Sequence, residues 1–343
     1  MLYRFYFKIS ILINQIFYLI PICLQKFKKD KDKLIAIYEL RQNGLSYNFF
    51  QFLIGAEMHR SQYGFKEVEL YVINKHRKKK YRWSLFYDSF KKKTIEERTF
   101  NLLPQLSGLF PNFSNIKIID KREFEFLAIR KSYFPITLFP RLPSTYNHLI
   151  DLKKLINSKL IPEFFPNNKN FYLEKILINW LTENNYCSFF TYTIRNSKFD
   201  KNRNSNVEYL PKLKKWLQTL NIGLIIIPDS EKNNLENNND SKAYKIGSLC
   251  SKDVSNRLYI YQKSNLNIFV PNGPSILCTY SKKTPYILLN AWPQNSIVKQ
   301  ESTWFNPKTM VTYWSDTEFQ KLTYNQDNFE DVKSAILDLI RVN

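Results

Sequence analysis

Short apolar runs alternate with amphipathic stretches in the first half of the chain. Residues 34–40, "LIAIYEL", are rich in strand formers, and a helical pattern follows over 47–63 with Gly64 at its end. Residues 67–73, "EVELYVI", again have strand composition, and residues 115–120 predict one more strand. This order predicts parallel strands joined by a helix.

The second half repeats the alternation with clearer boundaries. Residues 222–229, "IGLIIIPD", form an almost unbroken apolar run, which is typical of a strand buried on both faces of a parallel sheet. The pattern predicts an α/β fold with a doubly wound sheet. The other predicted elements are strands at 187–194, 267–271 and 286–290, and helices within 206–220, at 253–264, from Pro274 and at 327–341.

The chain has 343 residues, more than one hydrophobic core usually holds, so two domains are expected. A proline-rich stretch, 135–170, predicts the hinge between them. We therefore expect an N-terminal segment over 1–33, a first domain over 34–165 and a second over 166–343, with an Asn-rich surface loop at 232–240.

Residues 9–24 are largely apolar and lie between basic flanks. The run is short for a membrane span, which needs about 20 residues, and "PICLQKFKK" offers no small-residue cleavage site of a signal peptide. An interfacial helix on an anionic membrane surface and a simple buried helix both fit this pattern.

The chain carries 51 Lys and Arg against 30 Asp and Glu, a formal charge of +21. This excess favours anionic partners, although abundant Lys, Asn, Ile and Phe with 7 Gly are also typical of an AT-rich codon bias. The basic runs "HRKKKYR" and "KKK" at 91–93, with Tyr81 and Trp83 interleaved, support an alternative function: non-catalytic binding of nucleic acid or anionic lipid. Both runs lie in predicted loops, and blocks of like charge are usually solvated.

The cysteines and histidines have no ligand spacing. Cys23, Cys187, Cys250 and Cys278 lie far apart without a C-x-x-C pair, which argues against a zinc site and a disulfide framework. Cys187 and Cys278 are expected to be small buried apolar residues. His59, His76 and His148 are separated and there is no DxD pair of carboxylates, so no metal is expected. Neither a GxGxxG nor a Walker motif is present, so a standard dinucleotide or P-loop site is unsupported and no cofactor is expected.

Arg195 and Arg203 lie in "IRNSKFDKNRNSN", a polar loop between a predicted strand and the following helix. Parallel sheets bind ligands beyond the carboxyl ends of their strands, where helices begin. Ser205 with Glu208 matches a capping box, while Pro211 is an alternative first helical residue. Two arginines beside exposed amides predict a diphosphate-binding loop, and solvated surface arginines are the alternative.

A second stretch, "FVPNGPS", follows another predicted strand. Pro274 suits the first helical position with Asn272 or Gly273 as the cap, and glycine lets a ligand approach the backbone. The helix dipole and the Ser275 hydroxyl would favour an anion, although a tight turn needs the same residues. Asp229, at a strand end, could receive ribose or sugar hydroxyls or cap its own loop. The predicted diphosphate-binding residues are Arg195, Arg203, Asn204, Ser205, Asn272, Gly273, Pro274 and Ser275.

Three segments carry a family resemblance: "FFTYTIRNSKFDKNRNSNVEYLPKLKKWLQTLNIGLIIIPD", "NIFVPNGPSILCTYSKKTPYILLN" and "LIAIYELRQNGLSYNFFQFLIGAEMHR". They resemble bacterial glycosyltransferases of surface-polysaccharide loci, and more distantly lipopolysaccharide heptosyltransferases and bacterial fucosyltransferases of the GT-B fold. The resemblance covers most of 34–290. It implies a GT-B-like α/β fold, with two Rossmann-like doubly wound domains facing across a cleft.

The resemblance also implies a metal-independent glycosyltransferase with a nucleotide-sugar donor and a polysaccharide or lipid-linked acceptor. The predicted diphosphate-binding residues would face the donor, and Arg41, Asn43 and Gly44 would line the cleft on the acceptor side. The protein would be cytoplasmic and peripheral at the inner face of the cytoplasmic membrane. A sugar-nucleotide epimerase or a pyruvyl transferase on the same fold is a further alternative.

Two aspects of the chemistry stay open. Asn272 stands where heptosyltransferases commonly have an acidic or small polar residue before the glycine, so the donor sugar is not assigned. A general base is not assigned either, because Glu57 and His59 lie in a helix interior and are expected to be structural.

Overall fold

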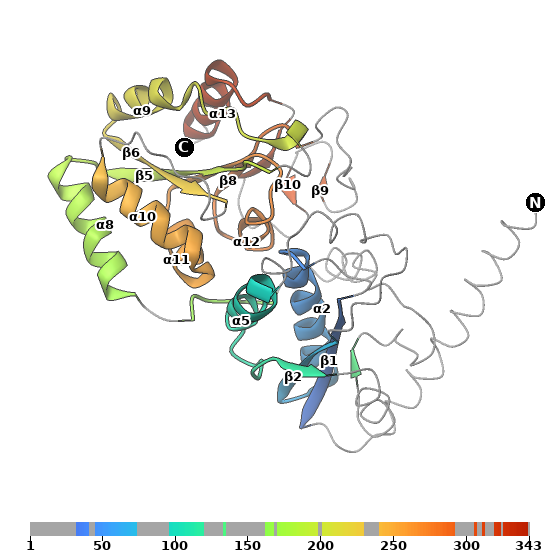
Figure 1. Ribbon diagram of the computed structural model, residues 1–343. Helices are drawn as coiled ribbons and strands as arrows, with labels where there is room; N and C mark the ends of the chain where they lie inside the picture. Colours follow the sequence, from blue (N-terminus) through green and yellow to red (C-terminus); the bar gives the residue numbers. More distant parts are fainter. Residues whose placement is uncertain are drawn as a thin grey trace, which may run out of the picture. The chain divides into compact units, whose positions relative to one another are not determined.

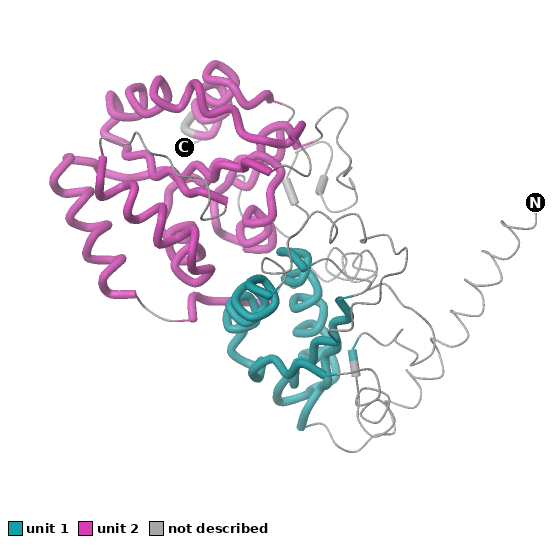
Figure 2. The backbone as a smooth tube through the Cα atoms, viewed as in Figure 1, with its two compact units in different colours: residues 1–151 teal, residues 152–343 magenta. Residues whose placement is uncertain are grey.

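The computed structural model describes residues 32–40, 45–73, 96–119, 133–134, 162–167, 170–197, 201–229, 240–291, 305–306, 311–312, 319–323 and 325–341. The chain divides into two compact units, Met1–Asp151 and Leu152–Asn343 (Figure 2). This boundary lies inside the proline-rich stretch that predicts the hinge, ahead of the predicted domain end at 165. The N-terminal segment up to residue 31 lies outside the described residues.

Unit 1 is built on a parallel sheet with the strand order β3-β2-β1-β4 (Figure 1). The central strands β1 (Lys33–Glu39) and β2 (Glu67–Ile73) pair along their whole lengths. β3 (Lys117–Ile119) borders β2, and β4 (Tyr133–Phe134) borders β1. Helix α2 (Asn48–Tyr63) connects β1 to β2, which confirms the predicted β-α-β unit. The other described elements of unit 1 are a π-helical turn, η1 (Arg98–Leu102), and α5 (Leu103–Ser107).

Helix α2 packs on the sheet of unit 1 through aromatic side chains. The ring centroids of Phe49 and Phe52 lie 4.7 and 5.0 Å from that of Tyr38 in β1, and all three side chains are buried. The helix ends at Gly64, whose φ of 73° is left-handed and whose N–H donates to carbonyls of the last turn. Glycine adopts this conformation without strain, so the predicted stop signal is confirmed.

Unit 2 is built on a sheet with the order β6-β5-β7-β8-β11-β10-β9. β5 (Ser188–Ile194) pairs in parallel with β6 (Ile222–Pro228) on one side and with β7 (Leu266–Phe269) on the other. β8 (Tyr286–Leu288) and β11 (Gln320–Leu322) continue the parallel arrangement. Both units are therefore α/β with parallel strands, as the sequence predicts. Two short antiparallel strands follow in the sheet order, β10 (Val311–Thr312) and β9 (Phe305–Asn306).

Helices cover both faces of the unit 2 sheet (Figure 1). On one face lie α9 (Leu210–Gln218) and α13 (Phe329–Arg341), and on the other α8 (Phe171–Glu183), α10 (Ser241–Lys252) and α11 (Val254–Lys263). The apolar side chains of α13 dock against the sheet and α9. Buried side chains that form the core on this face include Tyr192, Ile194, Leu213, Leu217, Leu224, Ile268, Ile287, Val332 and Ile336.

The sequence pattern predicts neither α8 nor α10 of unit 2. α10 begins immediately after the predicted Asn-rich loop. The last residue of that loop, Asp240, caps α10 because its Oδ1 accepts the N–H of Ala243 at 3.1 Å. The preceding residues 230–239 lie outside the described residues.

The buried cysteines were predicted in part. Cys278 is buried, as expected, but Cys187 is exposed and its Sγ donates to the backbone O of Asn221 at 3.3 Å. Cys187 lies just ahead of β5, so it escapes the burial that the strand itself undergoes.

Gly247 sets how closely α10 approaches the sheet. A Cβ at this position would lie 2.1 Å from the backbone O of Ile226 in β6, a distance that real Cβ atoms do not show. Both groups belong to packed backbone, so neither can move away at low cost.

We predict that Gly247→Ala lowers the free energy of unfolding by about 1–3 kcal/mol, because the methyl group forces α10 away from β6. Urea unfolding followed by circular dichroism measures this change. Ser248→Ala, next to it on the half-buried side of α10, is the matched control and should stay within about 0.5 kcal/mol of wild type. Equal stabilities of Gly247→Ala and wild type would contradict the packing described.

Candidate functional site

The strand order of unit 2 reverses between β5 and β7. β5 is the first of its parallel strands along the chain, the second (β6) lies on one side of it, and the third (β7) lies on the other. In doubly wound sheets this reversal is the topological switch point, and ligands bind there beyond the carboxyl ends of the strands. We call the edge at which these parallel strands end the carboxyl edge of unit 2.

The two predicted donor segments and Asp229 lie at this carboxyl edge. Arg195 follows β5, Asp229 follows β6, and residues 272–275 follow β7. The strands β5 and β7 end nearly level, because Thr193 lies opposite Phe269. We call residues 195–209 the arginine loop and residues 272–275 the glycine turn. The structure therefore brings the start of the arginine loop and the glycine turn to the same edge of one sheet.

Arg195 is a buried residue with 8% of its surface exposed. Its Nη1 lies 3.9 Å from Oδ2 of Asp229, whose side chain is 22% exposed. The backbone N–H of Asp229 donates to the carbonyl of Ile194 at 2.8 Å, which joins the ends of β5 and β6. The alternative of a solvated surface arginine is therefore wrong for Arg195. A charge withdrawn from water interacts more strongly with a nearby anion than an exposed one does.

Asn204 and Ser205 close the loop that begins at Arg195. Ser205 and Arg195 exchange two hydrogen bonds, from Ser205 N to Arg195 O and from Arg195 N to Ser205 Oγ, both at 2.9 Å. The Asn204 side chain accepts from Ser197 N at 2.8 Å and donates to Ser197 O at 3.0 Å. Arg203 is half-buried and ends the 3-10 turn η2 (Lys201–Arg203). Asn204 and Ser205 thus shape the backbone around Arg195.

The predicted capping box of Ser205 and Glu208 is wrong. Helix α9 starts at Leu210, its cap position Tyr209 has no side-chain cap, and Pro211 lies in the first turn. The Ser205 hydroxyl is instead bound to Arg195, as described above. The alternative start at Pro211 is the one that the structure supports, because proline lacks the N–H that would otherwise need a cap.

Asn272 organises the glycine turn. Its Oδ1 accepts the N–H of Ser275 at 2.9 Å, and the Ser275 hydroxyl donates to Asn272 O at 2.8 Å. The Asn272 Nδ2 atom is buried, and among the described residues no acceptor lies within hydrogen-bond distance of it. An unsatisfied buried donor costs about 1–3 kcal/mol, so this amide is a candidate for binding an acceptor atom of a ligand.

The helix after the glycine turn is short. α12 (Ile276–Thr279) is a single turn, and the Ser275 N–H is already bound to Asn272. One turn carries little of the dipole that a longer helix develops. The helix N-terminus therefore adds little to anion binding at this position, and side-chain donors have to supply it.

Asp327 is a residue of the carboxyl edge that sequence reasoning missed. Its Oδ1 accepts the hydroxyl of Tyr192 at 2.6 Å and also the hydroxyl of Tyr209, and its Oδ2 accepts the N–H of Asn206 at 2.6 Å. Burial raises the pKa of Asp327 above its usual range, and the bonds from Tyr192 and Tyr209 oppose that rise. Burial likewise raises the pKa of Tyr192 and Tyr209, so both hydroxyls stay protonated donors. No local motif marks Asp327, because its partners lie more than a hundred residues away in the sequence.

Unit 1 has a switch point of its own, between β1 and β4. Glu39 ends β1 there and is buried, with 5% of its surface exposed. The following residues 41–44, which include the predicted acceptor-side residues Arg41, Asn43 and Gly44, lie outside the described residues. The next residue, Leu45, accepts a hydrogen bond at its carbonyl from Arg98 Nη1 at 3.2 Å.

Glu57 and His59 are buried in α2 with structural partners. Both Glu57 oxygens accept from the guanidinium of Arg60 at 2.8 Å, and Oε1 also accepts from Asn112 Nδ2 at 3.1 Å. The His59 ring contacts Tyr63 and Phe134, with centroid distances of 4.4 and 5.6 Å. These contacts agree with the expectation that both residues are structural.

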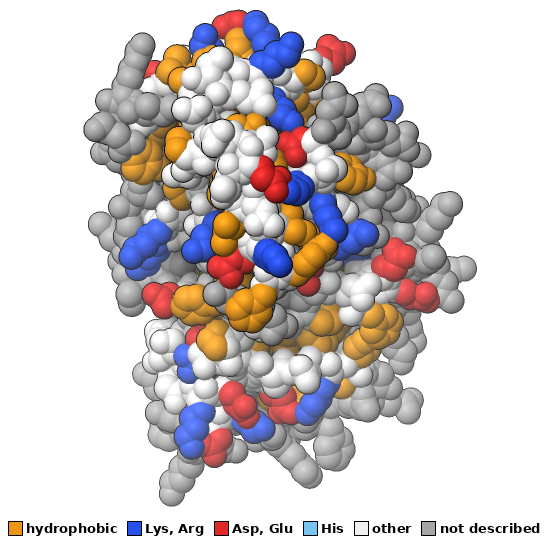
Figure 3. Space-filling model, turned by 90° about the vertical axis from the view of Figure 1, so that its left-hand side faces the viewer, with side chains coloured by type: hydrophobic (Ala, Val, Ile, Leu, Met, Phe, Trp, Pro, Cys, Tyr) orange, Lys and Arg blue, Asp and Glu red, His pale blue; other side chains and the backbone are white. Residues whose placement is uncertain are grey.

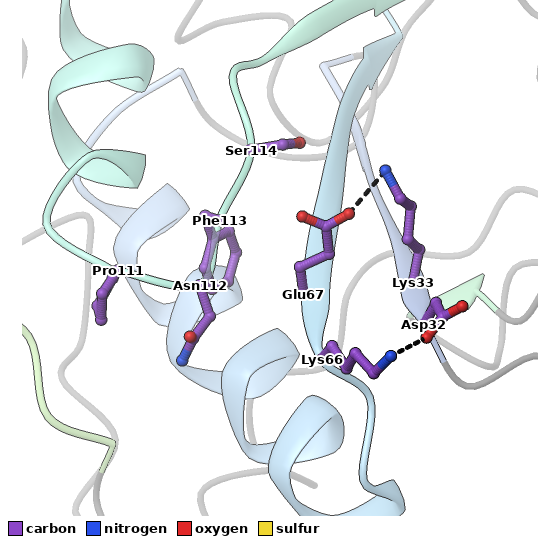
Figure 4. A pocket seen from close by; sticks show the side chains of 8 residues that line it. All are labelled: Asp32, Lys33, Lys66, Glu67, Pro111, Asn112, Phe113 and Ser114. Atoms are coloured by element: carbon purple, nitrogen blue, oxygen red, sulfur yellow. Dashed lines mark ion pairs between the residues drawn. The ribbon is translucent and has the colours of Figure 1, made fainter.

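An open pocket of about 550 Å³ lies in unit 1 at the amino ends of β1 and β2 (Figure 4). Ion pairs at 2.6 Å join Lys33 to Glu67 and Lys66 to Asp32 beside it. The hydrogen bond from Lys66 lowers the pKa of Asp32. These charges are mutually paired, and the pocket lies at the edge opposite to the one where parallel sheets bind ligands. It is therefore not the candidate site.

Charged side chains are mixed on the side of the molecule that Figure 3 shows, where Lys and Arg are interspersed with acidic and hydrophobic side chains. The two lysine-rich runs behind the nucleic-acid alternative lie outside the described residues. Within the part of the chain that the structure describes, no group of three or more His, Cys, Asp or Glu side chains could hold a metal ion. The helices described there are also too short or too polar to cross a bilayer.

The chain has a structural likeness to a solved protein. The chain is similar to the crystal structure of a glycosyl transferase family 9 protein from Veillonella parvula, with 10% sequence identity and a TM-score of 0.48. The alignment covers 91% of this chain and 92% of that one. No protein-family model matches the sequence, and no curated protein matches it.

We predict that Asn272→Ala is about 1 kcal/mol less stable than Asn272→Ser, because Ala leaves the Ser275 N–H without an acceptor while Ser keeps a side-chain oxygen there. Both variants lose the buried Nδ2, so the difference between them isolates the cap. Urea denaturation of the three proteins measures both changes. If Ala and Ser destabilise equally, Asn272 does not cap this turn.

Proposed function

We propose that this protein is a glycosyltransferase that binds the diphosphate of a nucleotide-sugar donor at the carboxyl edge of unit 2. The observation that carries the proposal is the Asn272 amide, a buried donor with no acceptor among the described residues, at the same switch point as buried Arg195. The acceptor would be a cell-surface polysaccharide or a lipid-linked glycan, as the family resemblance implies.

Two kinds of donor favour a diphosphate at this edge. A guanidinium presents a fixed fork of N–H groups that matches phosphate oxygens, and it stays charged at every physiological pH. Arg195 is held there by the hydrogen bonds of its backbone to Ser205, so little freedom is lost on binding. Arg203, half-buried in the same loop, is the second proposed phosphate ligand.

The same groups would act in the transfer step. The bond between the anomeric carbon and the diphosphate oxygen breaks, and its electron pair leaves with the nucleoside diphosphate. Fixed donors that face this developing charge lower the barrier, because they need no reorganisation when the charge appears. Arginine and amide donors would meet this need, so we propose transfer that does not require a divalent cation. Activity retained in EDTA would support that part of the proposal.

Asp229 would receive hydroxyls of the donor. It lies beside Arg195 at the end of β6 and is partly exposed, so its carboxylate can accept hydrogen bonds from a ribose or a sugar. The diphosphate and a sugar hydroxyl would then be bound at neighbouring strand ends.

Unit 1 would hold the acceptor. We propose that Arg41, Asn43 and Gly44 line this side, as the family resemblance implies. Membrane association through residues 1–33, at the inner face of the cytoplasmic membrane, would bring the enzyme to lipid-linked acceptors.

We predict that Arg195→Lys weakens nucleoside diphosphate binding by roughly ten-fold and that Arg195→Glu weakens it about a hundred-fold or more. Isothermal titration calorimetry with UDP, GDP, CDP, dTDP and ADP measures the affinities. Lys215→Glu, which changes an exposed charge in the last turn of α9, is the matched control and should bind like wild type. Unchanged affinity in both Arg195 variants would exclude Arg195 as a ligand of the diphosphate.

Two observations separate this proposal from its alternatives. Product analysis distinguishes sugar transfer from epimerisation and from pyruvyl transfer. Steeply salt-dependent binding to oligonucleotides, without a thermal shift from nucleoside diphosphates, would favour the nucleic-acid alternative.

A further inference from the structure

Asp327 joins three segments of unit 2 that are far apart in the sequence. It precedes α13, and it binds Tyr192 in β5, Asn206 in the loop after Arg195, and Tyr209 at the start of α9. Tyr192 is fully buried and Tyr209 is 8% exposed, so the two tyrosine bonds are largely shielded from bulk water, whereas the bond from Asn206 is exposed. Removing one partner of such a bond leaves the other without compensation, which is more costly than at the surface.

Two sets of hydrogen bonds fix the arginine loop. Ser205 and Arg195 exchange two hydrogen bonds, from Ser205 N to Arg195 O and from Arg195 N to Ser205 Oγ. The next residue, Asn206, is bound through its N–H to Asp327. A contiguous path therefore leads from Asp327 through Asn206 and Ser205 to the backbone of Arg195.

We propose that Asp327 is a positioning residue for the diphosphate site, which sets the place of the Arg195 guanidinium from the C-terminal helix. This inference rests on the proposed function, since it assumes that Arg195 binds the diphosphate. The apolar side chains of α13 pack this helix against the core. Asp327, just ahead of α13, then holds the arginine loop from there.

A carboxylate suits this position because it meets only donors. Two hydroxyls and one N–H converge on its two oxygens. An asparagine of the same shape carries no charge, so its hydrogen bonds are weaker than those of a carboxylate. It can keep all three partners only if both tyrosine hydroxyls turn round and accept from its NH2 group. Asp327→Asn therefore loosens the loop with little change in volume.

The test is a double-mutant cycle on UDP, GDP, CDP, dTDP or ADP affinity, whichever nucleotide wild type binds best. Asp327→Asn should weaken binding about ten-fold in the wild-type background but no more than about two-fold in the Arg195→Lys background, because the fork to be positioned is then absent. Asp327→Glu should recover part of the loss. Losses that multiply in the double variant would show a merely structural role and would overturn the inference.

Asp331→Asn is the matched control. Asp331 lies in the first turn of α13, close to Asp327 in the sequence. Its Oδ2 accepts from Gln326 N at 2.7 Å and from Asn328 Nδ2 at 3.2 Å, so its partners lie outside the arginine loop. This variant should bind the nucleotide like wild type. If it weakens binding as much as Asp327→Asn does, the effect belongs to the helix start in general and the inference falls.

Hydrogen exchange read by mass spectrometry makes the outcome independent of the proposed function. Amides of peptide 196–209 should exchange at least ten-fold faster in Asp327→Asn than in Asp331→Asn, without any ligand. If wild type binds no nucleoside diphosphate, the proposed function fails while faster exchange still supports loop anchoring. Equal exchange in the two variants overturns the inference whether or not nucleotide binds.

Discussion

The parallel pairing of β5 with both β6 and β7 is the constraint on which the candidate site depends. Parallel neighbours end at the same edge, so the segments that follow them must leave the sheet there. The reversal of strand order at β5 separates the connections on its two sides, which creates room at the strand ends. Arg195 and the Asn272 turn flank that position, although about eighty residues separate them in the sequence.

Hydrogen bonds hold the polar groups of this edge in place before any ligand is present. Ser205 fixes the backbone of Arg195, Ser275 fixes the Oδ1 of Asn272, and Asp327 fixes the far end of the loop. The Nδ2 of Asn272, at the same edge, is buried and has no acceptor among the described residues. Binding sites leave such donors for the ligand because their geometry is then already correct when the ligand arrives.

Sequence reasoning succeeded where one local signal decides the structure. The β1-α2-β2 unit was predicted almost to the residue, because its strands are short segments rich in strand formers and Gly64 supplies a left-handed stop. It failed for α10, whose buried face consists of Ala243, Ile246, Gly247 and Cys250. The close approach to β6 requires small residues there, so the helix shows only a weak hydrophobic stripe. α8 was missed for a related reason, since Phe171, Tyr172 and Ile178 are exposed and obscure its periodicity.

The candidate site shows the same division. Placement of Arg195, Asp229 and Asn272 at strand ends follows from the alternation of strands and helices, and it was predictable. The use of Ser205 as a partner of Arg195, the burial of that arginine and the bonds of Asp327 depend on contacts between distant segments. Local patterns do not contain such contacts, which is why the capping box was predicted at Ser205.

The most direct test of the central claim is a crystal structure of the protein with the nucleoside diphosphate that it binds best. The account predicts the diphosphate beyond the ends of β5 and β7, with its oxygens within hydrogen-bond distance of the Arg195 guanidinium and of Asn272 Nδ2. A diphosphate bound elsewhere, for example in the pocket at the amino ends of β1 and β2, would contradict it.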